Sequence, residues 1–267
     1  MKNMSIEKNE FPIGKKTKKR TNGMGMPKDH VREFEDDDRH MIRYWNKRQD
    51  FDENFPDENV TAGELVKEAE TMRLMFGELE DRYGIRVPHF ESFIAEHDTK
   101  HQRYKNKPIK TLFSLADKVN GQKLHLVDIG RLDERERTRF RQELKTLFSS
   151  LVKYFADKTG NNEAYLRDVF RPEQYVYGRT EKDSGNGMYL VDIEPRTQKY
   201  PAEDEIAEIG NQFVRLCRLM AEYGVEYKGD DFEKLLKALE SGFGGEEYFK
   251  IFKKHSFDYF LKKDKAA

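Results

Sequence analysis

Apolar residues recur every three or four positions in several stretches of the chain, which is the period of one face of an α-helix. Four segments show this spacing: 61–83, 133–158, 206–224 and 230–239. In the first of them, Thr61 and Glu64 match a capping box, in which two side chains satisfy free backbone N–H groups at the start of a helix. The pattern therefore predicts one helix in the first half of the chain and a mostly helical second half.

Shorter stretches alternate apolar and polar residues, or hold short apolar runs, and these features indicate β-strands. We expect strands at 87–95, 111–119, 174–178 and 188–193. A polar loop joins the first two, and a turn rich in glycine and aspartate joins the last two. Helices and antiparallel strands in this order predict an α+β fold.

The first 60 residues are poor in apolar residues. Residues 1–30 are polar and contain a basic cluster, which predicts a flexible N-terminal arm. The cluster consists of Lys15, Lys16, Lys18, Lys19 and Arg20. Such a run can contact the phosphates of nucleic acid, but the composition favours a solvated tail. Residues 31–59 alternate in charge, and we expect a short helix and a loop there.

Composition narrows the class of protein further. The 267 residues contain 49 Lys and Arg against 50 Asp and Glu, so no overall charge attracts the chain to nucleic acid or to a membrane. No apolar run reaches the roughly 18 residues of a membrane span. The single cysteine, Cys217, excludes an internal disulfide and sits on an apolar stripe, as a buried thiol would. We expect a cytoplasmic protein.

The stretch Tyr165 to Pro195 carries the clearest candidate chemistry. It places two acids, Asp168 and Asp192, just before and at the end of one predicted hairpin. Gln174 opens the first strand and Asp192 closes its antiparallel partner, so we expect these two residues to lie near each other.

The order of predicted elements resembles the protein-kinase-like fold, including its aminoglycoside-phosphotransferase branch. Residues 61–83 resemble the small-lobe helix, and 133–158 resembles the long central helix. Asn120-Gly121, which we expect to form a turn, falls at the hinge. The resemblance covers residues 60 to 225 as an order of elements. It implies a mostly helical large lobe at 122–267 with its hairpin at 174–193, and a small-lobe-like part at 31–121.

Three residues match the family's catalytic residues one by one. Arg167-Asp168 matches the Arg-Asp pair of the catalytic loop, and Asp192 follows an apolar strand as the metal-binding acid does. Gln174 lies one residue beyond the position of the family's asparagine. The resemblance implies that Asp168 is the catalytic base, that Asp192 and Gln174 bind Mg²⁺, and that ATP is the phosphate donor.

The chain also departs from the family's pattern. No apolar strand before residue 60 is predicted that could carry the lysine that pairs with a helix glutamate, so we expect a trimmed small lobe. Ile193-Glu194 follows Asp192 where protein kinases have Phe-Gly. These departures leave a second hypothesis open, a pseudokinase-like module that binds a protein or nucleic-acid partner and has no enzymatic activity.

Each candidate site residue also has a purely structural interpretation. Asp192 fits a turn cap at a strand end. Asp168 fits a cap or an ion pair with Arg167 or Arg171, and Gln174 fits an ordinary strand-edge position.

Overall fold

The structure is a computed structural model. It describes residues 17–21, 27–34, 39–45, 62–98, 108–166, 168–191, 197–198, 203–225, 227, 231–242 and 250. The chain forms two compact units, one of residues 1–75 with 88–118 and the other of residues 76–87 with 119–267. The fold is α+β, as the pattern predicted. No helix among these described ranges is long and apolar enough to cross a membrane.

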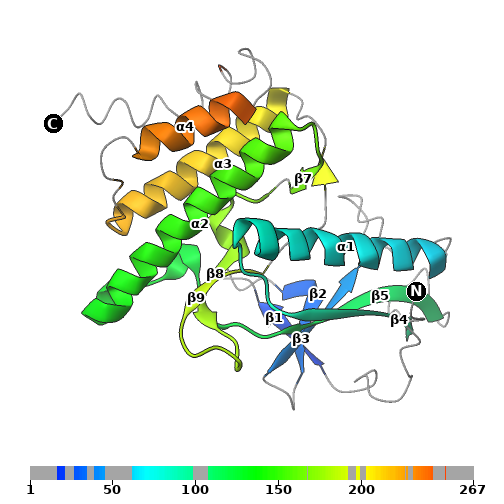
Figure 1. The fold of residues 1–267 in the computed structure, drawn as a ribbon. Helices are drawn as coiled ribbons and strands as arrows, with labels where there is room; N and C mark the ends of the chain where they lie inside the picture. Colours follow the sequence, from blue (N-terminus) through cyan, green and yellow to red (C-terminus); the bar gives the residue numbers. More distant parts are fainter. Residues whose placement is uncertain are drawn as a thin grey trace. The chain divides into compact units, whose positions relative to one another are not determined.

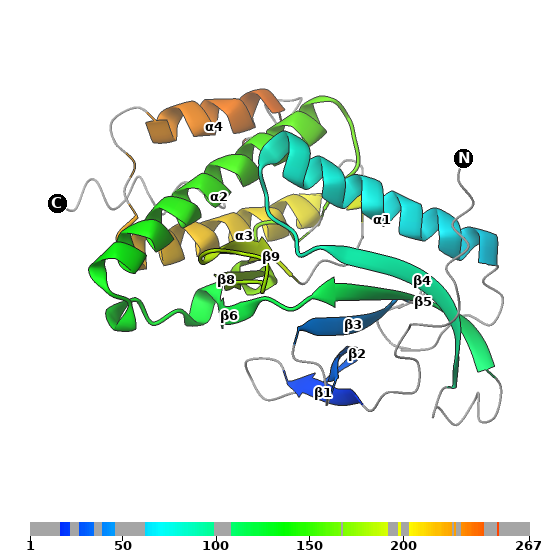
Figure 2. The ribbon, with the colours of Figure 1, turned by 60° about the horizontal axis from the view of Figure 1, so that its bottom comes forward.

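The first unit contains a five-stranded antiparallel sheet in the order β1-β2-β3-β5-β4 (Figure 2). Its strands are β1 (Thr17–Thr21), β2 (Pro27–Phe34), β3 (His40–Trp45), β4 (Phe90–Asp98) and β5 (Pro108–Asp117). Phe93 and Phe113 face each other across β4 and β5 with their rings stacked at 5.2 Å, and both are buried. The helix α1 (Ala62–Tyr83) follows β3 in the chain, and its residues 62–75 belong to this unit.

The strands β1, β2 and β3 correct the prediction for the first 60 residues. The helix predicted within 31–59 is wrong where the structure describes that range, because β2 and β3 run through 31–34 and 40–45. Within the predicted arm at 1–30 the structure describes β1 and the start of β2, and the flexibility of the arm stays a prediction. Antiparallel pairing sets charged residues opposite each other, as with Lys18 and Glu33. A strand of this kind gains its order from backbone hydrogen bonds and cross-strand pairs, so its apolar pattern is weak.

The second unit is built on helices (Figure 1). They are α2 (Glu134–Gly160), α3 (Glu203–Glu222) and α4 (Asp231–Gly242), and all three were predicted to within a few residues. Asp133 caps α2 by accepting a hydrogen bond from Glu136 N at 2.8 Å. Aromatic residues fill the core, and Phe148 of α2 packs against Phe213 of α3 at 5.3 Å between ring centroids.

Two small sheets complete the second unit. One consists of β6 (Asn120–Lys123), β8 (Tyr175–Arg179) and β9 (Gly187–Leu190) in the order β6-β8-β9, and the other pairs β7 (Tyr165–Leu166) with β10 (Thr197–Gln198). The predicted hairpin is therefore present as β8 and β9. Besides residues 76–87, this unit contains the chain from residue 119 onward. The predicted division at residue 121 stays a prediction.

Asn120-Gly121 is a strand and not the predicted turn. Gly121 lies directly opposite Gly178 of β8. A Cβ atom on Gly121 would lie 2.1 Å from the carbonyl oxygen of Tyr177. Glycine is needed at this close approach of two backbones, so its presence did not signal a chain reversal.

Candidate active-site loop

The loop between β7 and β8 contains Asp168 and has a fixed backbone. Arg171 N donates to the Asp168 carbonyl at 3.0 Å, and Gln174 N donates to the Arg171 carbonyl at 3.0 Å. The second bond belongs to a short 3₁₀ helix, η4 (Pro172–Gln174), which leads directly into β8. Before the loop, Leu166 N donates to the buried Tyr154 hydroxyl at 2.9 Å, and this bond attaches the loop's start to α2.

The Asp168 carboxylate is held through one oxygen. Arg171 Nε lies 3.2 Å from Oδ1, and Gln212 Nε2 donates to the same oxygen at 3.1 Å. Oδ2 has no hydrogen bond or ion pair from any residue that the structure describes. The side chain is 34% exposed, so the carboxylate is both oriented and reachable. The ion pair with Arg171 is one of the structural interpretations of Asp168.

Three side chains on one face of α3 contact this loop. Glu208 Oε1 accepts from Arg171 Nη2 at 2.5 Å, Gln212 binds Asp168, and Arg215 pairs with Glu173. Positions 208, 212 and 215 lie on the same side of a helix. The sequence analysis missed these residues. Their helical spacing places them on one side of α3, but no local pattern in the sequence relates them to Asp168.

Gln174 lies beside the end of β9. Val191 N donates to the Gln174 carbonyl at 2.9 Å, so the chain neighbour of Asp192 is next to Gln174. Asp192 itself, Arg167 and Glu194 lie outside the described residues. The Gln174 amide oxygen Oε1 is buried and has no hydrogen-bond partner in the described part of the chain. Such an oxygen suits a hard cation such as Mg²⁺, and the metal role of Gln174 and Asp192 stays a prediction.

The tyrosines of β8 support the loop by packing. Tyr175 is fully buried, its hydroxyl donates to the Val169 carbonyl, and burial raises its pKa well above the ordinary value. Tyr177 donates to Glu136 Oε1 at 2.5 Å, and burial raises its pKa as well. Cys217 of α3 is buried, as predicted, and burial raises the pKa of its thiol. All three stay protonated near neutral pH and have structural roles.

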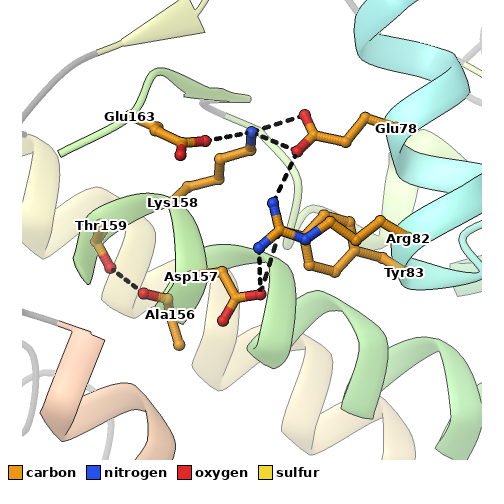
Figure 3. Close-up of polar contacts among 8 residues, drawn as sticks. All are labelled: Glu78, Arg82, Tyr83, Ala156, Asp157, Lys158, Thr159 and Glu163. Carbon is orange, nitrogen blue, oxygen red and sulfur yellow. Dashed lines mark hydrogen bonds and ion pairs between the residues drawn. The ribbon is translucent and has the colours of Figure 1, made fainter. Parts of the chain in front are cut away.

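A separate cluster of charges joins the end of α1 to the end of α2 (Figure 3). Lys158 Nζ lies 2.7 and 2.6 Å from the two carboxylate oxygens of Glu78 and 2.8 Å from Glu163 Oε2. Burial lowers the pKa of Lys158, but the hydrogen bonds with Glu163 and Glu78 outweigh burial and raise it overall. Beside this group, Arg82 contacts both Glu78 and Asp157 at 3.3 Å. The cluster is structural, and the sequence analysis did not identify it.

The described ranges contain no group of three or more His, Cys, Asp or Glu residues that could hold a metal ion. A magnesium site here would therefore depend on Asp192 together with the Gln174 amide.

Comparison with known families adds no further assignment. The chain matches no protein-family model and none of the curated proteins.

Proposed function

We propose that this protein is a kinase-like phosphotransferase with Asp168 as its base and Asp192 as its principal Mg²⁺ ligand. The observation that carries the proposal is the geometry of the short loop from Asp168 to Gln174. One end of the loop presents a carboxylate oxygen, and the other end is hydrogen bonded to Val191, next to Asp192. Phosphoryl transfer needs this combination of an oriented base and a nearby metal-binding acid.

The order of elements in each unit supports the same proposal. The first unit has three strands, a helix and two more strands in one antiparallel sheet. The second has a long helix, then a loop and a hairpin. The connection between β1 and β2 contains Gly23 and Gly25. In protein kinases a glycine-rich loop between strands covers the ATP phosphates. The strands β1, β2 and β3, which the sequence analysis did not expect, support the proposal because a kinase small lobe would need strands before its helix.

Each of the candidate residues in and beside this loop has a proposed role in phosphate transfer. Asp168 would accept the proton of the attacking hydroxyl through Oδ2, because Arg171 and Gln212 hold Oδ1. The buried Gln174 Oε1 and the Asp192 carboxylate would bind Mg²⁺. The ion, when bound, neutralises charge that develops on the transferred phosphate.

A second candidate function is a pseudokinase-like binding module without phosphoryl transfer. The sequence of β3 favours this candidate. In protein kinases the strand β3 carries the phosphate-binding lysine. Here β3, His40–Trp45, contains no lysine, and Arg43 is its only Lys or Arg residue. Arginine and lysine are not interchangeable at such positions, because the guanidinium is larger and planar.

A radiometric assay of phosphate transfer from [γ-³²P]ATP with Mg²⁺ distinguishes the two candidate functions. The phosphotransferase proposal predicts transfer to protein or water that is lost in Asp168→Asn and kept in the control Asp128→Asn. Asp128 is half-exposed and is bonded locally to Gly130 N and Arg131. An Arg43→Lys variant tests the second candidate. Nucleotide binding without transfer in both the wild type and this variant would favour the binding module.

A further inference from the structure

The β8–β9 hairpin has a second feature at the end opposite to Gln174. There, the turn after β8 and the start of α2 line a cavity of about 660 Å³ that is open to solvent. Three arginines line it, Arg135 and Arg139 from the first turns of α2 and Arg179 from the end of β8. The four residue pairs of the hairpin separate this cavity from the loop that contains Asp168.

The carboxylates in the cavity wall already have partners. Asp133 accepts from Glu136 N at 2.8 Å. Glu136 Oε1 accepts from the Tyr177 hydroxyl at 2.5 Å and from Asn186 Nδ2 at 2.6 Å. These bonds fix the two acids as parts of the wall.

The three arginines, in contrast, make no hydrogen bond or ion pair with any residue in the described ranges. Three guanidinium groups against two carboxylates leave the wall with an excess of one positive charge. The N-terminus of the 27-residue helix α2 adds further positive potential at the same place.

Gly185 allows one of these arginines its position. A Cβ atom on Gly185 would lie 2.0 Å from Arg139 Nη1 and 2.7 Å from its Cζ. The guanidinium therefore lies directly against the turn, where any larger residue would displace it. Gly185 does not have a positive φ, so alanine fits its backbone.

We propose that this cavity is an anion site that binds a small phosphate-bearing ligand, with pyrophosphate as its simplest representative. The planar guanidinium group pairs with phosphate oxygens through two parallel hydrogen bonds, and three of them lie in one hollow. The volume falls within the roughly 300–1,000 Å³ that is usual for small-molecule sites. The site does not depend on the phosphotransferase proposal, because it lies at the other end of the hairpin.

Isothermal titration of the full chain with sodium pyrophosphate, at low salt and without Mg²⁺, tests this inference. We expect saturable binding that weakens at least about tenfold in Arg139→Ala and in Arg179→Ala, since each loses a charge-assisted hydrogen-bond donor. Gly185→Ala should weaken binding without any change of charge, because it displaces Arg139.

The matched control is Arg131→Ala. Arg131 is 84% exposed, pairs with Asp128 and does not line the cavity. Undetectable binding at millimolar pyrophosphate would overturn the inference. So would an equal loss of affinity in Arg131→Ala and Arg139→Ala, because that result would mean a general attraction to positive charge.

Discussion

Gln212 Nε2 donates a hydrogen bond to Asp168 Oδ1 across 3.1 Å, from the middle of α3 to the loop after β7. Gln212 is only 3% exposed, and its Oε1 has no hydrogen-bond partner in the described part of the chain. Leaving such an atom buried costs about 1–3 kcal/mol. The glutamine therefore orients the carboxylate at some expense in stability, which is common at functional sites.

Gln212→Glu should make the free energy of unfolding depend on pH. Two carboxylates would face each other, so the pair would hold a proton more tightly in the folded state than in the unfolded state. The variant should match the wild type best at low pH and lose about 1–3 kcal/mol as pH rises above the unfolded glutamate pKa of about 4.3. Urea unfolding at several pH values measures this loss. A pH-independent difference from wild type would contradict the proposed contact.

Tyr154→Phe should loosen the start of the candidate loop. The substitution removes the hydroxyl that accepts the hydrogen bond of Leu166 N and leaves a buried N–H group unpaired. We expect a loss of about 1–3 kcal/mol in the free energy of unfolding, together with faster hydrogen exchange at Leu166. Tyr227→Phe is the matched control, because the Tyr227 hydroxyl lies 3.4 Å from Ser149 Oγ and from the Lys145 carbonyl and does not contact Leu166 N. Equal exchange rates at Leu166 in both variants would refute the role given to Tyr154.

Lys158→Met should destabilise the second unit. Lys158 is 7% exposed and is the shared partner of Glu78 and Glu163, so its removal leaves two carboxylates close together. Because both acids are partly exposed, we expect a loss of about 1–3 kcal/mol rather than the full cost of a buried charge. The exposed Lys153, on the same helix, gives the control Lys153→Met, which should change stability by less than about 0.5 kcal/mol. The urea midpoint measures both, and similar effects would contradict the account of this cluster.

Asp183 should contribute its full stability above its ordinary pKa of 3.8 and lose that contribution in more acidic solution. Its Oδ2 accepts hydrogen bonds from Thr180 N, Thr180 Oγ1 and the Tyr189 hydroxyl at 2.6–2.7 Å. Burial raises the pKa of Asp183, but these bonds outweigh burial and lower it overall. A lowered folded-state pKa means that the contribution is complete above pH 3.8 and is lost as pH falls through the folded value.

Asp183→Asn is the corresponding variant. The difference in unfolding free energy between wild type and Asp183→Asn should be constant at neutral pH and shrink below pH 3.8. Urea titrations between pH 2.5 and 7 measure it. A difference that grows on acidification would contradict the assigned hydrogen bonds.

The sequence predicted the helices and the hairpin because both bury apolar residues at a regular period. The apolar residues of α2 and the apolar strand before Asp192 form clear patterns in the sequence. The pairing of the hairpin strands predicted that Gln174 would lie near the end of β9. The polar partners of Asp168 on α3 were not predicted, because contacts such as Gln212 with Asp168 join residues 44 positions apart. The loop geometry depends on tertiary packing that no local pattern encodes.

The strands before residue 46 were missed for a different reason. Charged residues occupy opposite positions of neighbouring strands, as Lys18 and Glu33 do in the backbone register, so the sequence lacks the apolar alternation by which strands are identified. Gly121 caused the opposite error, because a turn was predicted where the structure has a strand. It was interpreted as a turn residue, whereas it permits the close approach of β6 to β8.

Thermal unfolding with ATP tests most directly the central claim that Asp192 binds Mg²⁺ together with the nucleotide. The melting temperature Tm is measured with Mg²⁺ or with EDTA in the wild type, in Asp192→Asn and in the control Asp128→Asn. A ligand at about 100 times its Kd stabilises a protein by about 2.7 kcal/mol, and each kcal/mol raises Tm by roughly 2–4 °C at this size. We predict a Mg²⁺-dependent rise of several degrees in wild type and Asp128→Asn that is absent in Asp192→Asn. No Mg²⁺-dependent rise at millimolar ATP, or an equal rise in Asp192→Asn, would contradict the claim.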